Sequence, residues 1–278
     1  MVELSQLGRT GSYGRLDVYR RLVGAPVRSH TAYRTSFAID LATNALIPIV
    51  DLVAVLAMFQ VTRTLGGFDI DEVLVMYALA ASAFALADLA VGNIEKIRFY
   101  VRQGLLDAVL VRPLSALGQL LAVDFTIRRV ARLAVGLVVL GLAVTRAGVD
   151  WTPGRVVLVV TAPVFGALFF AALFVATATV AFWWIESGEF ANAFTYGGRD
   201  FTSYPVSVYS GFFRRVFAYS LGFAFVAYYP ALALLGRTDP LGLPSWAGWL
   251  SPLVSVAAAG VAGLVWRMGI RHYRSTGS

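Results

Sequence analysis

The residues that could do chemistry in this sequence are a few carboxylates set within long apolar stretches. Asp40 and Asp51 lie in one such stretch, and Asp88 lies near the end of the next. Eleven residues separate Asp40 from Asp51, and eleven steps of about 100° return nearly to the same face of a helix. Asn44 lies close to that face. The spacing therefore predicts one polar stripe, and Asp40, Asn44 and Asp51 are the candidate residues of a translocation path.

A purely structural role is the competing interpretation of these carboxylates. Charged groups surrounded by hydrocarbon are costly, so they mark functional sites or pair with one another. Neighbouring arginines could neutralise them, or they could cap the backbone that Pro48 interrupts. Asp124 and Arg128 are four residues apart and can pair on one helix. We expect the arginines that follow to extend toward lipid head groups; these are Arg128, Arg129 and Arg132.

Enzymatic chemistry has no residues to carry it. The chain has no cysteine, and its two histidines, His30 and His272, lie near opposite ends. This excludes thiolate chemistry and a structural zinc site, which needs more ligands. The sequence also lacks a GxxxxGK[ST] phosphate-binding loop, a GxSxG nucleophile turn and an HExxH helix. We expect no catalytic residue, metal or cofactor in this chain.

The elements that must hold the carboxylates are apolar helices. Of the 278 residues, 58% are hydrophobic and only 14% are charged, whereas a soluble domain carries roughly 25% charged residues. A membrane-crossing helix needs about 20 apolar residues. The sequence therefore predicts an all-α integral membrane protein with about six spans, at approximately Phe37–Val61, Val73–Val91, Val130–Thr145, Val156–Trp184, Val216–Leu235 and Trp249–Trp266.

The arginines predict the orientation of these spans. If both termini lie inside, 19 of the 23 basic residues fall on the inner side and four on the outer side, as the positive-inside rule requires. The net charge of +7 then reflects topology, and we expect no nucleic-acid partner because no solvated basic face exists to hold phosphates.

This orientation divides the chain into three parts. Residues 1–35 form a basic inner arm, residues 36–268 the six-span domain, and residues 269–278 an inner tail. Within the arm, Gly14–Tyr33 is either an amphipathic helix on the inner leaflet, with arginines toward phospholipid, or a disordered basic segment. The domain has two long inner connections, at 92–117 and 185–215.

The first inner connection is predicted to be an amphipathic helix. Between Ile94 and Arg112, apolar residues recur at helical spacing and charged residues occupy the other faces. Gly104 is a candidate break. The second connection is too long and too aromatic for a plain linker. Either segment could simply lie on the membrane surface, or it could dock a cytoplasmic partner.

Residues Arg102 to Leu114, RQGLLDAVLVRPL, resemble the RxGxLDxxLxRPL stretch of ABC-transporter permease subunits of the type-two exporter superfamily. Aromatic runs farther along the chain look like the same prokaryotic branch. They are Phe182-Trp183, Tyr204-Pro205, Val208-Tyr209 and Tyr228-Tyr229-Pro230-Ala231.

The resemblance implies a multi-pass permease in a bacterial inner membrane, with both termini cytoplasmic. Such subunits pair with a second permease, the same or a related chain, and bind two copies of a separate cytoplasmic ATPase that holds ATP and Mg. The first inner connection then acts as the coupling helix. The residues that match it here are Arg102, Gly104, Leu105, Asp107, Leu110, Arg112 and Pro113.

The resemblance also implies an outer hairpin that re-enters the membrane, for which Gly236–Pro252 is the candidate. It leaves the substrate open, because the family's substrates range over lipids, glycans, drugs and peptides.

Two other function classes compete with an ATP-driven exporter. An ion-coupled secondary carrier would need mid-membrane carboxylates, of which only Asp51 clearly fits, and usually carries internal repeats. The first three and last three spans show no convincing repeat. A membrane-embedded enzyme acting on lipids would lack a nucleophile and a base.

Overall fold

The computed structural model describes residues 34–122 and 129–273. Within these ranges the chain is helical, and its only extended pairing is an isolated bridge between Leu65 and Phe68. The helices are α2 (Arg34–Val61), α3 (Ile70–Val91), α4 (Ile97–Arg102), α5 (Leu105–Leu110), α6 (Ala116–Ala122), α7 (Arg129–Arg146), α8 (Pro153–Thr179), α9 (Gly188–Thr202), α10 (Gly211–Phe213), α11 (Tyr228–Leu235) and α12 (Ser251–His272).

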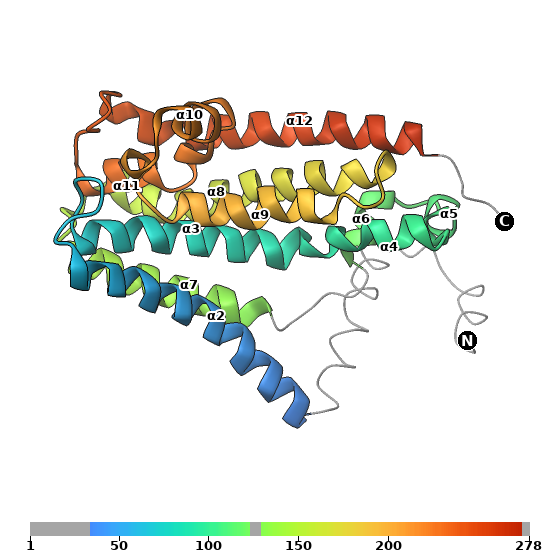
Figure 1. Cartoon of the computed structure of the whole chain (residues 1–278), viewed down its shortest axis with the longest axis horizontal. Helices are drawn as coiled ribbons and strands as arrows, with labels where there is room; N and C mark the ends of the chain where they lie inside the picture. The colour runs from blue at the N-terminus through green and yellow to red at the C-terminus, as the bar shows by residue number, and fades with distance from the viewer. Residues whose placement is uncertain (1–33, 123–128, 274–278) are drawn as a thin grey trace.

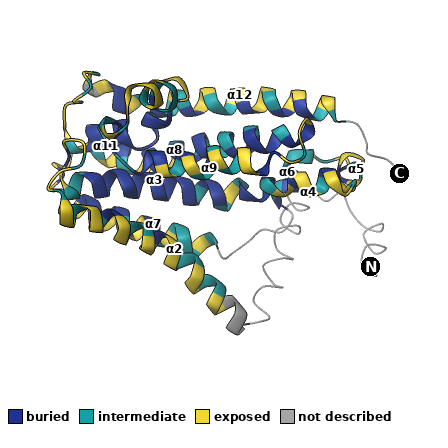
Figure 2. Ribbon diagram, viewed as in Figure 1, coloured by how far each residue is buried: buried dark blue, intermediate teal, exposed yellow. Residues whose placement is uncertain are grey.

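Helix α3 is the centre of the bundle and packs against α7, α8, α9 and α11. Figure 2 shows it as the most continuously buried helix. In its most apolar stretch 83% of the residues are buried, against 11% in α2 and 22% in α12. Small side chains permit this close packing: a Cβ added at Gly136 of α7 would lie 3.3 Å from the backbone of Ser82. The core of the molecule is therefore built around α3.

The start of α3 is fixed by a reciprocal capping box. The Asp69 carboxylate accepts from the Glu72 backbone N–H at 2.9 Å, and the Glu72 carboxylate accepts from the Asp69 N–H at 3.0 Å. Two backbone donors that the helix cannot satisfy internally are thereby bonded.

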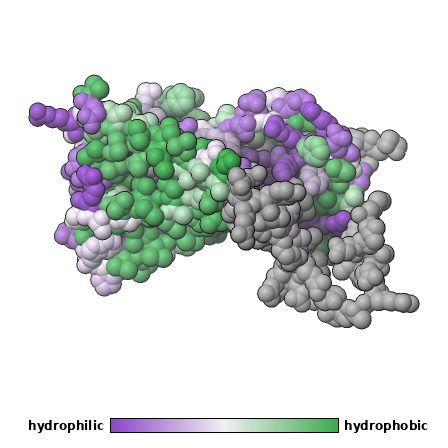
Figure 3. Space-filling model, turned by 90° about the horizontal axis from the view of Figure 1, so that it is seen from below, coloured by the Kyte–Doolittle hydropathy of each residue, from purple (hydrophilic) through white to green (hydrophobic). Residues whose placement is uncertain are grey.

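The outer surface of the bundle carries an apolar belt. Large aliphatic side chains of α2, α7, α8 and α12 are exposed there, among them Val50, Val138, Val160 and Leu264. Figure 3 shows a broad hydrophobic face between more polar ends. Four helical stretches are long and apolar enough to cross a membrane within the described residues: Ala38–Val61, Ile70–Arg102, Pro153–Phe182 and Trp246–His272. The prediction of a multi-pass α-helical membrane protein is confirmed.

The fifth predicted span, Val216–Leu235, is wrong as a single helix. The chain forms two helical pieces, Gly211–Ser220 and Phe223–Leu235, bent by 62° at the break between them. Gly222 lies at that break with φ +88°, a conformation that residues with a Cβ rarely adopt. We call Gly211–Leu235 the bent segment.

Helix α9 replaces part of the second predicted inner connection. It packs along α8 and α3 (Figure 1), and the chain then reaches the loop between α2 and α3, where the Ser207 hydroxyl donates to the Gly66 carbonyl at 2.6 Å. That loop lies at the opposite end of the bundle from α4, α5 and α6. The segment predicted as the second inner connection, 185–215, therefore runs along the bundle as α9, and its second half contacts the loop between α2 and α3.

The first predicted inner connection is a compact group of short helices. A 3-10 turn at Gly92–Lys96 leads into α4, and α5 and α6 follow. The predicted break at Gly104 is confirmed: its φ of +65° separates α4 from α5. The predicted amphipathic helix at Gly14–Tyr33 and the pair Asp124–Arg128 lie outside the described residues.

A single introduced cysteine tests the orientation, because the natural chain has none. Leu105 is 44% exposed on α5, and Thr64 is exposed in the loop between α2 and α3. We expect a membrane-impermeant maleimide to label Thr64→Cys in intact cells, and Leu105→Cys only after the cells are opened. Labelling of Leu105→Cys in intact cells would overturn the orientation.

Candidate functional site

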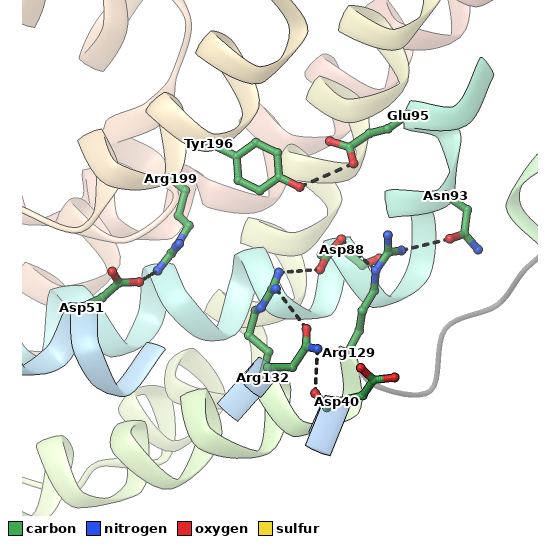
Figure 4. A network of polar contacts seen from close by, with 10 residues as sticks. Asp40, Asp51, Asp88, Asn93, Glu95, Arg129, Arg132, Tyr196 and Arg199 are labelled. Carbon is green, nitrogen blue, oxygen red and sulfur yellow. Dashed lines mark hydrogen bonds and ion pairs between the residues drawn. The ribbon is translucent and has the colours of Figure 1, made fainter. Parts of the chain in front are cut away.

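A buried carboxylate with two guanidinium partners joins α3 to α7. Arg129 and Arg132 are three residues apart on α7, so they share a face of the helix. Arg132 Nη1 lies 2.8 Å from Asp88 Oδ2, and Arg129 Nε lies 3.2 Å from Asp88 Oδ1 (Figure 4). Arg129 Nη1 also donates to the Asp88 carbonyl at 2.8 Å. The Asp88 side chain is only 3% exposed, so this network replaces the water that the charges would otherwise bind.

Two asparagines extend this network to other helices. Arg129 Nη1 donates to Asn93 Oδ1 at 3.2 Å, and Asn93 Nδ2 donates to the Leu121 carbonyl of α6 at 3.3 Å. Arg132 Nη2 donates to Asn44 Oδ1 of α2 at 3.3 Å. One charged cluster therefore connects α2, α3, α6 and α7.

This geometry corrects the interpretation of the α7 arginines. They were predicted to extend toward head groups, but Arg129 and Arg132 turn inward to Asp88, with side chains only 18% and 16% exposed. Asp88 therefore has the structural role that was the alternative interpretation of the sequence, namely an ion pair with arginines. Sequence spacing could not identify this pairing, because the partners are more than 40 residues apart.

A second ion pair lies farther along α2. The Asp51 carboxylate pairs with Arg199 of α9, whose guanidinium carbon lies 5.6 Å from the centre of the Phe84 ring of α3. Close by, the Tyr77 hydroxyl donates to the Pro48 carbonyl at 2.8 Å. Arg199 was missed as a site residue because it was placed in an inner connection, and only the contact with α2 identifies it.

The three candidate path residues face the bundle but do not form one site. Asn44 belongs to the Asp88 cluster, and Asp51 belongs to the pair with Arg199. Asp40 lies one turn before Asn44, and its backbone carbonyl accepts from Asn44 Nδ2 at 2.8 Å. The predicted polar stripe of α2 therefore attaches this helix to α7 and α9 at separate points.

The predicted coupling residues form an exposed elbow at the end of the bundle opposite the α2–α3 loop (Figure 1). Leu106 and Val109 are buried, whereas Leu105 and Leu110 point outward, and the next residue, Val111, is 85% exposed. Gln119 of α6 supports the elbow by donating to the carbonyls of Val109 and Leu114 at 3.0 and 3.2 Å. The elbow thus presents apolar side chains on a supported backbone.

Charged residues surround the apolar side chains of the elbow. Arg102 pairs with Glu186, which follows α8, and both side chains are more than half exposed. Arg112 and Pro113 are exposed, and Asp107 is half-buried. Such a mixture of exposed apolar and charged groups is what a docking surface needs.

At the end of the bundle where α3 begins, Arg237 connects the loop after α11 to the start of α3. Its Nε lies 2.8 Å from Glu72 Oε1, its Nη2 donates to the Gly67 carbonyl at 3.1 Å, and its guanidinium carbon lies 5.6 Å from the Phe68 ring centre. Asp239 organises the same loop by accepting from the Tyr228 hydroxyl at 2.8 Å and from the Leu241 N–H at 3.0 Å. These contacts connect the loop after α11, the end of α11 and the start of α3.

Comparison with known proteins gives one match. The model of the family described as "ABC-2 family transporter protein" matches residues 45–277. No curated protein and no solved structure matches the chain. The family match covers α3 to α12 and most of α2, so it includes Asp88, its two arginines and the elbow, while Asn44 lies one residue before it.

The Asp88 cluster and the Asp71–Arg146 pair make a matched comparison, because both join α3 to α7. Asp88→Asn leaves two arginines without their buried counter-charge, and we expect a loss of about 3–5 kcal/mol of stability. Asp71→Asn removes an exposed pair and should cost about 0–1 kcal/mol. Thermal unfolding in detergent measures both. Equal shifts in the midpoint would contradict a stabilising role for the Asp88 cluster.

Proposed function

The chain belongs to the ABC-2 transporter family, and we propose that it is the membrane-spanning subunit of an ATP-driven exporter whose ATPase is a separate protein. The match over residues 45–277 carries this proposal. In it, two copies of a cytoplasmic ATPase bind ATP and Mg and serve two permease chains, identical or related. The complex lies in a bacterial inner membrane, with both termini of this chain inside, and moves its substrate outward.

The proposed subunit has six membrane crossings. Helices α2, α3, α8 and α12 would supply four of them, and α7 and α9 the other two. Helix α7 has 18 residues but carries arginines at both ends, and α9 has 15 residues. Together with α2, α3, α8 and α12 they alternate in direction between the two ends of the bundle (Figure 1). In this arrangement the bent segment enters from the outer end and returns to it. This supports a re-entrant outer element at 211–235, ahead of the hairpin Gly236–Pro252, which stays a prediction.

The elbow of α4 and α5 is the proposed contact with the ATPase. The exposed side chains of Phe99, Leu105, Leu110 and Val111 would be covered by a partner. Because the ATPase dimer closes when it binds ATP, its closure would push on this elbow. Only a partner that binds one conformation more tightly than the other can shift the balance between them.

A polar connection leads from the elbow into the bundle. The 3-10 turn before α4 contains Asn93, which contacts both Arg129 and the carbonyl of Leu121. Movement of α4 would therefore act on the start of α7 and on α6. Helix α2 is the element most able to respond, since few of its residues are buried and its polar attachments are few.

An ion-coupled secondary carrier is less well supported. Such a carrier needs carboxylates that can release their counter-charge to a proton or cation. Asp88 and Asp51 are both paired with arginines. Proton-driven uptake by the purified protein alone would favour the carrier.

Docking of the ATPase is tested by charging the elbow. We expect Val111→Glu to reduce the ATPase that co-purifies in gentle detergent by about tenfold, equivalent to roughly 1.4 kcal/mol of binding free energy. The control, Thr64→Glu, places the same charge on the outer loop and should change nothing. If both variants retain the ATPase equally, the elbow is not its docking surface.

Coupling is tested separately from docking. The double variant Asp107→Ala/Arg112→Ala keeps the apolar side chains of the elbow, so the ATPase should still co-purify. We expect the permease to lose its effect on the rate of ATP hydrolysis, because these side chains would transmit the ATPase movement. The readout is ATP hydrolysis per complex with and without the permease, and an unchanged effect would remove the proposed role of the two residues.

A further inference from the structure

An apolar groove opens beside α8, α12 and the bent segment. Its volume is about 500 Å³, which lies within the range of about 300–1,000 Å³ typical of ligand pockets. Alanines of α8 and α12 leave the space between these helices unfilled. They are Ala172, Ala176, Ala257, Ala258 and Ala262.

The wall opposite the alanines comes from the bent segment. The groove is lined there by Tyr219 to Phe223, around the left-handed Gly222. Phe223 is buried, and its ring centre lies 5.2 Å from that of Phe169, near the middle of α8. The groove therefore reaches toward the middle of the apolar belt. An extended hydrocarbon chain fits this lining, because the chain carries no polar group that would lose a hydrogen bond when the groove encloses it.

Two arginines precede the groove on the same short helix. Arg214 and Arg215 lie one to two turns before Tyr219 and Ser220. Arg215 Nε donates to the Gly211 carbonyl at 3.1 Å, and within the described residues neither arginine has a carboxylate at ion-pair distance. Phe212 and Phe213 beside them are 70% and 53% exposed. Two uncompensated positive charges beside exposed aromatic rings are typical of the lipid head-group region.

The attachment of the bent segment points to one leaflet. The bent segment follows the loop that contacts Gly66 at the outer end, and it returns to that end at Arg237. Both ends of the bent segment are therefore attached at the end of the bundle where the α2–α3 loop lies, which fits a lipid of the outer leaflet in the proposed orientation.

We propose that this groove binds one anionic phospholipid of the outer leaflet, with an acyl chain between α8 and α12 and the phosphate at Arg214 and Arg215. A phosphate satisfies guanidinium donors and neutralises their charge, while the groove buries the chain. A second protein copy is the less suitable occupant, since its surface would have to supply both a narrow apolar projection and an anion. The site requires neither nucleotide nor the ATPase.

Photo-crosslinking tests the chain site. The purified full-length chain is placed in phosphatidylcholine nanodiscs that contain a minor fraction of phosphatidylglycerol with a diazirine in its acyl chain. We expect cross-links in peptides that contain the groove residues of α8 and α12. We expect Ala258→Trp, which fills the groove, to reduce them by about tenfold. The matched control is Val256→Trp on the exposed face of the same helix, which should leave them unchanged.

A second pair of variants separates the head-group site from the chain site. Arg214→Gln/Arg215→Gln should abolish the preference for labelled phosphatidylglycerol over labelled phosphatidylcholine while both lipids still label the groove. Ala176→Leu fills the groove from α8 and should repeat the loss if Ala258→Trp fails to fold. Size-exclusion profiles and unfolding midpoints verify that each variant is folded.

Two outcomes would overturn the proposal. They are equal labelling of Ala258→Trp and Val256→Trp, or cross-links spread evenly along the exposed face of α12. Because no ATPase or nucleotide is present, failure here leaves the exporter function untouched. Conversely, failure of ATPase docking leaves the lipid site untouched.

Discussion

Buried charge within an apolar belt is the constraint on which the rest of this structure depends. A carboxylate or guanidinium group removed from water is tolerated only when other groups replace its hydration. Asp88 meets this requirement with two arginines of α7, and the largely buried Arg199 of α9 meets it with Asp51 of α2. Each pair joins helices that are distant in sequence. The pairs therefore link these helices in addition to neutralising charge.

The helices divide into a rigid and a weakly held group for the same reason. Helix α3 is enclosed by close packing as well as by ion pairs, whereas α2 exposes most of its apolar side chains. Polar bonds at Asn44, Pro48 and Asp51 fasten α2 to the bundle. Polar bonds of this kind can exchange partners, while a packed core resists small displacements. Movement during transport is thus expected at α2, with α3 as the fixed reference.

The sequence predicts features that depend on local composition. The apolar stretches of α2, α3, α8 and α12 and the break at Gly104 all follow from residue type and spacing. Helix α9 was missed because its fifteen residues mix glycine, polar and charged side chains with aromatic rings. The bundle covers its polar face, and composition alone cannot reveal that. The bend at Gly222 was missed because both halves of 216–235 are apolar, so the stretch reads as one span.

The candidate site residues likewise divide into those that local sequence could identify and those that depend on contacts distant in sequence. The elbow was predicted as a unit because its residues are contiguous in the sequence. Gly104 has the positive φ of a turn, and Leu105 and Val111 are exposed beside it. The partners of Asp51 and Asp88 could not be predicted, since Arg199 is 148 residues from Asp51 and single-sequence spacing carries no information about such pairs. Arg129 and Arg132 were assigned to the membrane surface for lack of a visible partner.

Glu72 has two separate roles: it caps the first turn of α3 and it pairs with Arg237. If the loop after α11 moved away, the ion pair would be replaced by hydration, because Arg237 is nearly half exposed. The cap would remain, since it lies entirely within residues 69–72. The loop after α11 can therefore separate from the start of α3 and bind it again while α3 stays helical. The Glu72–Arg237 ion pair would then form again in the same geometry after each separation.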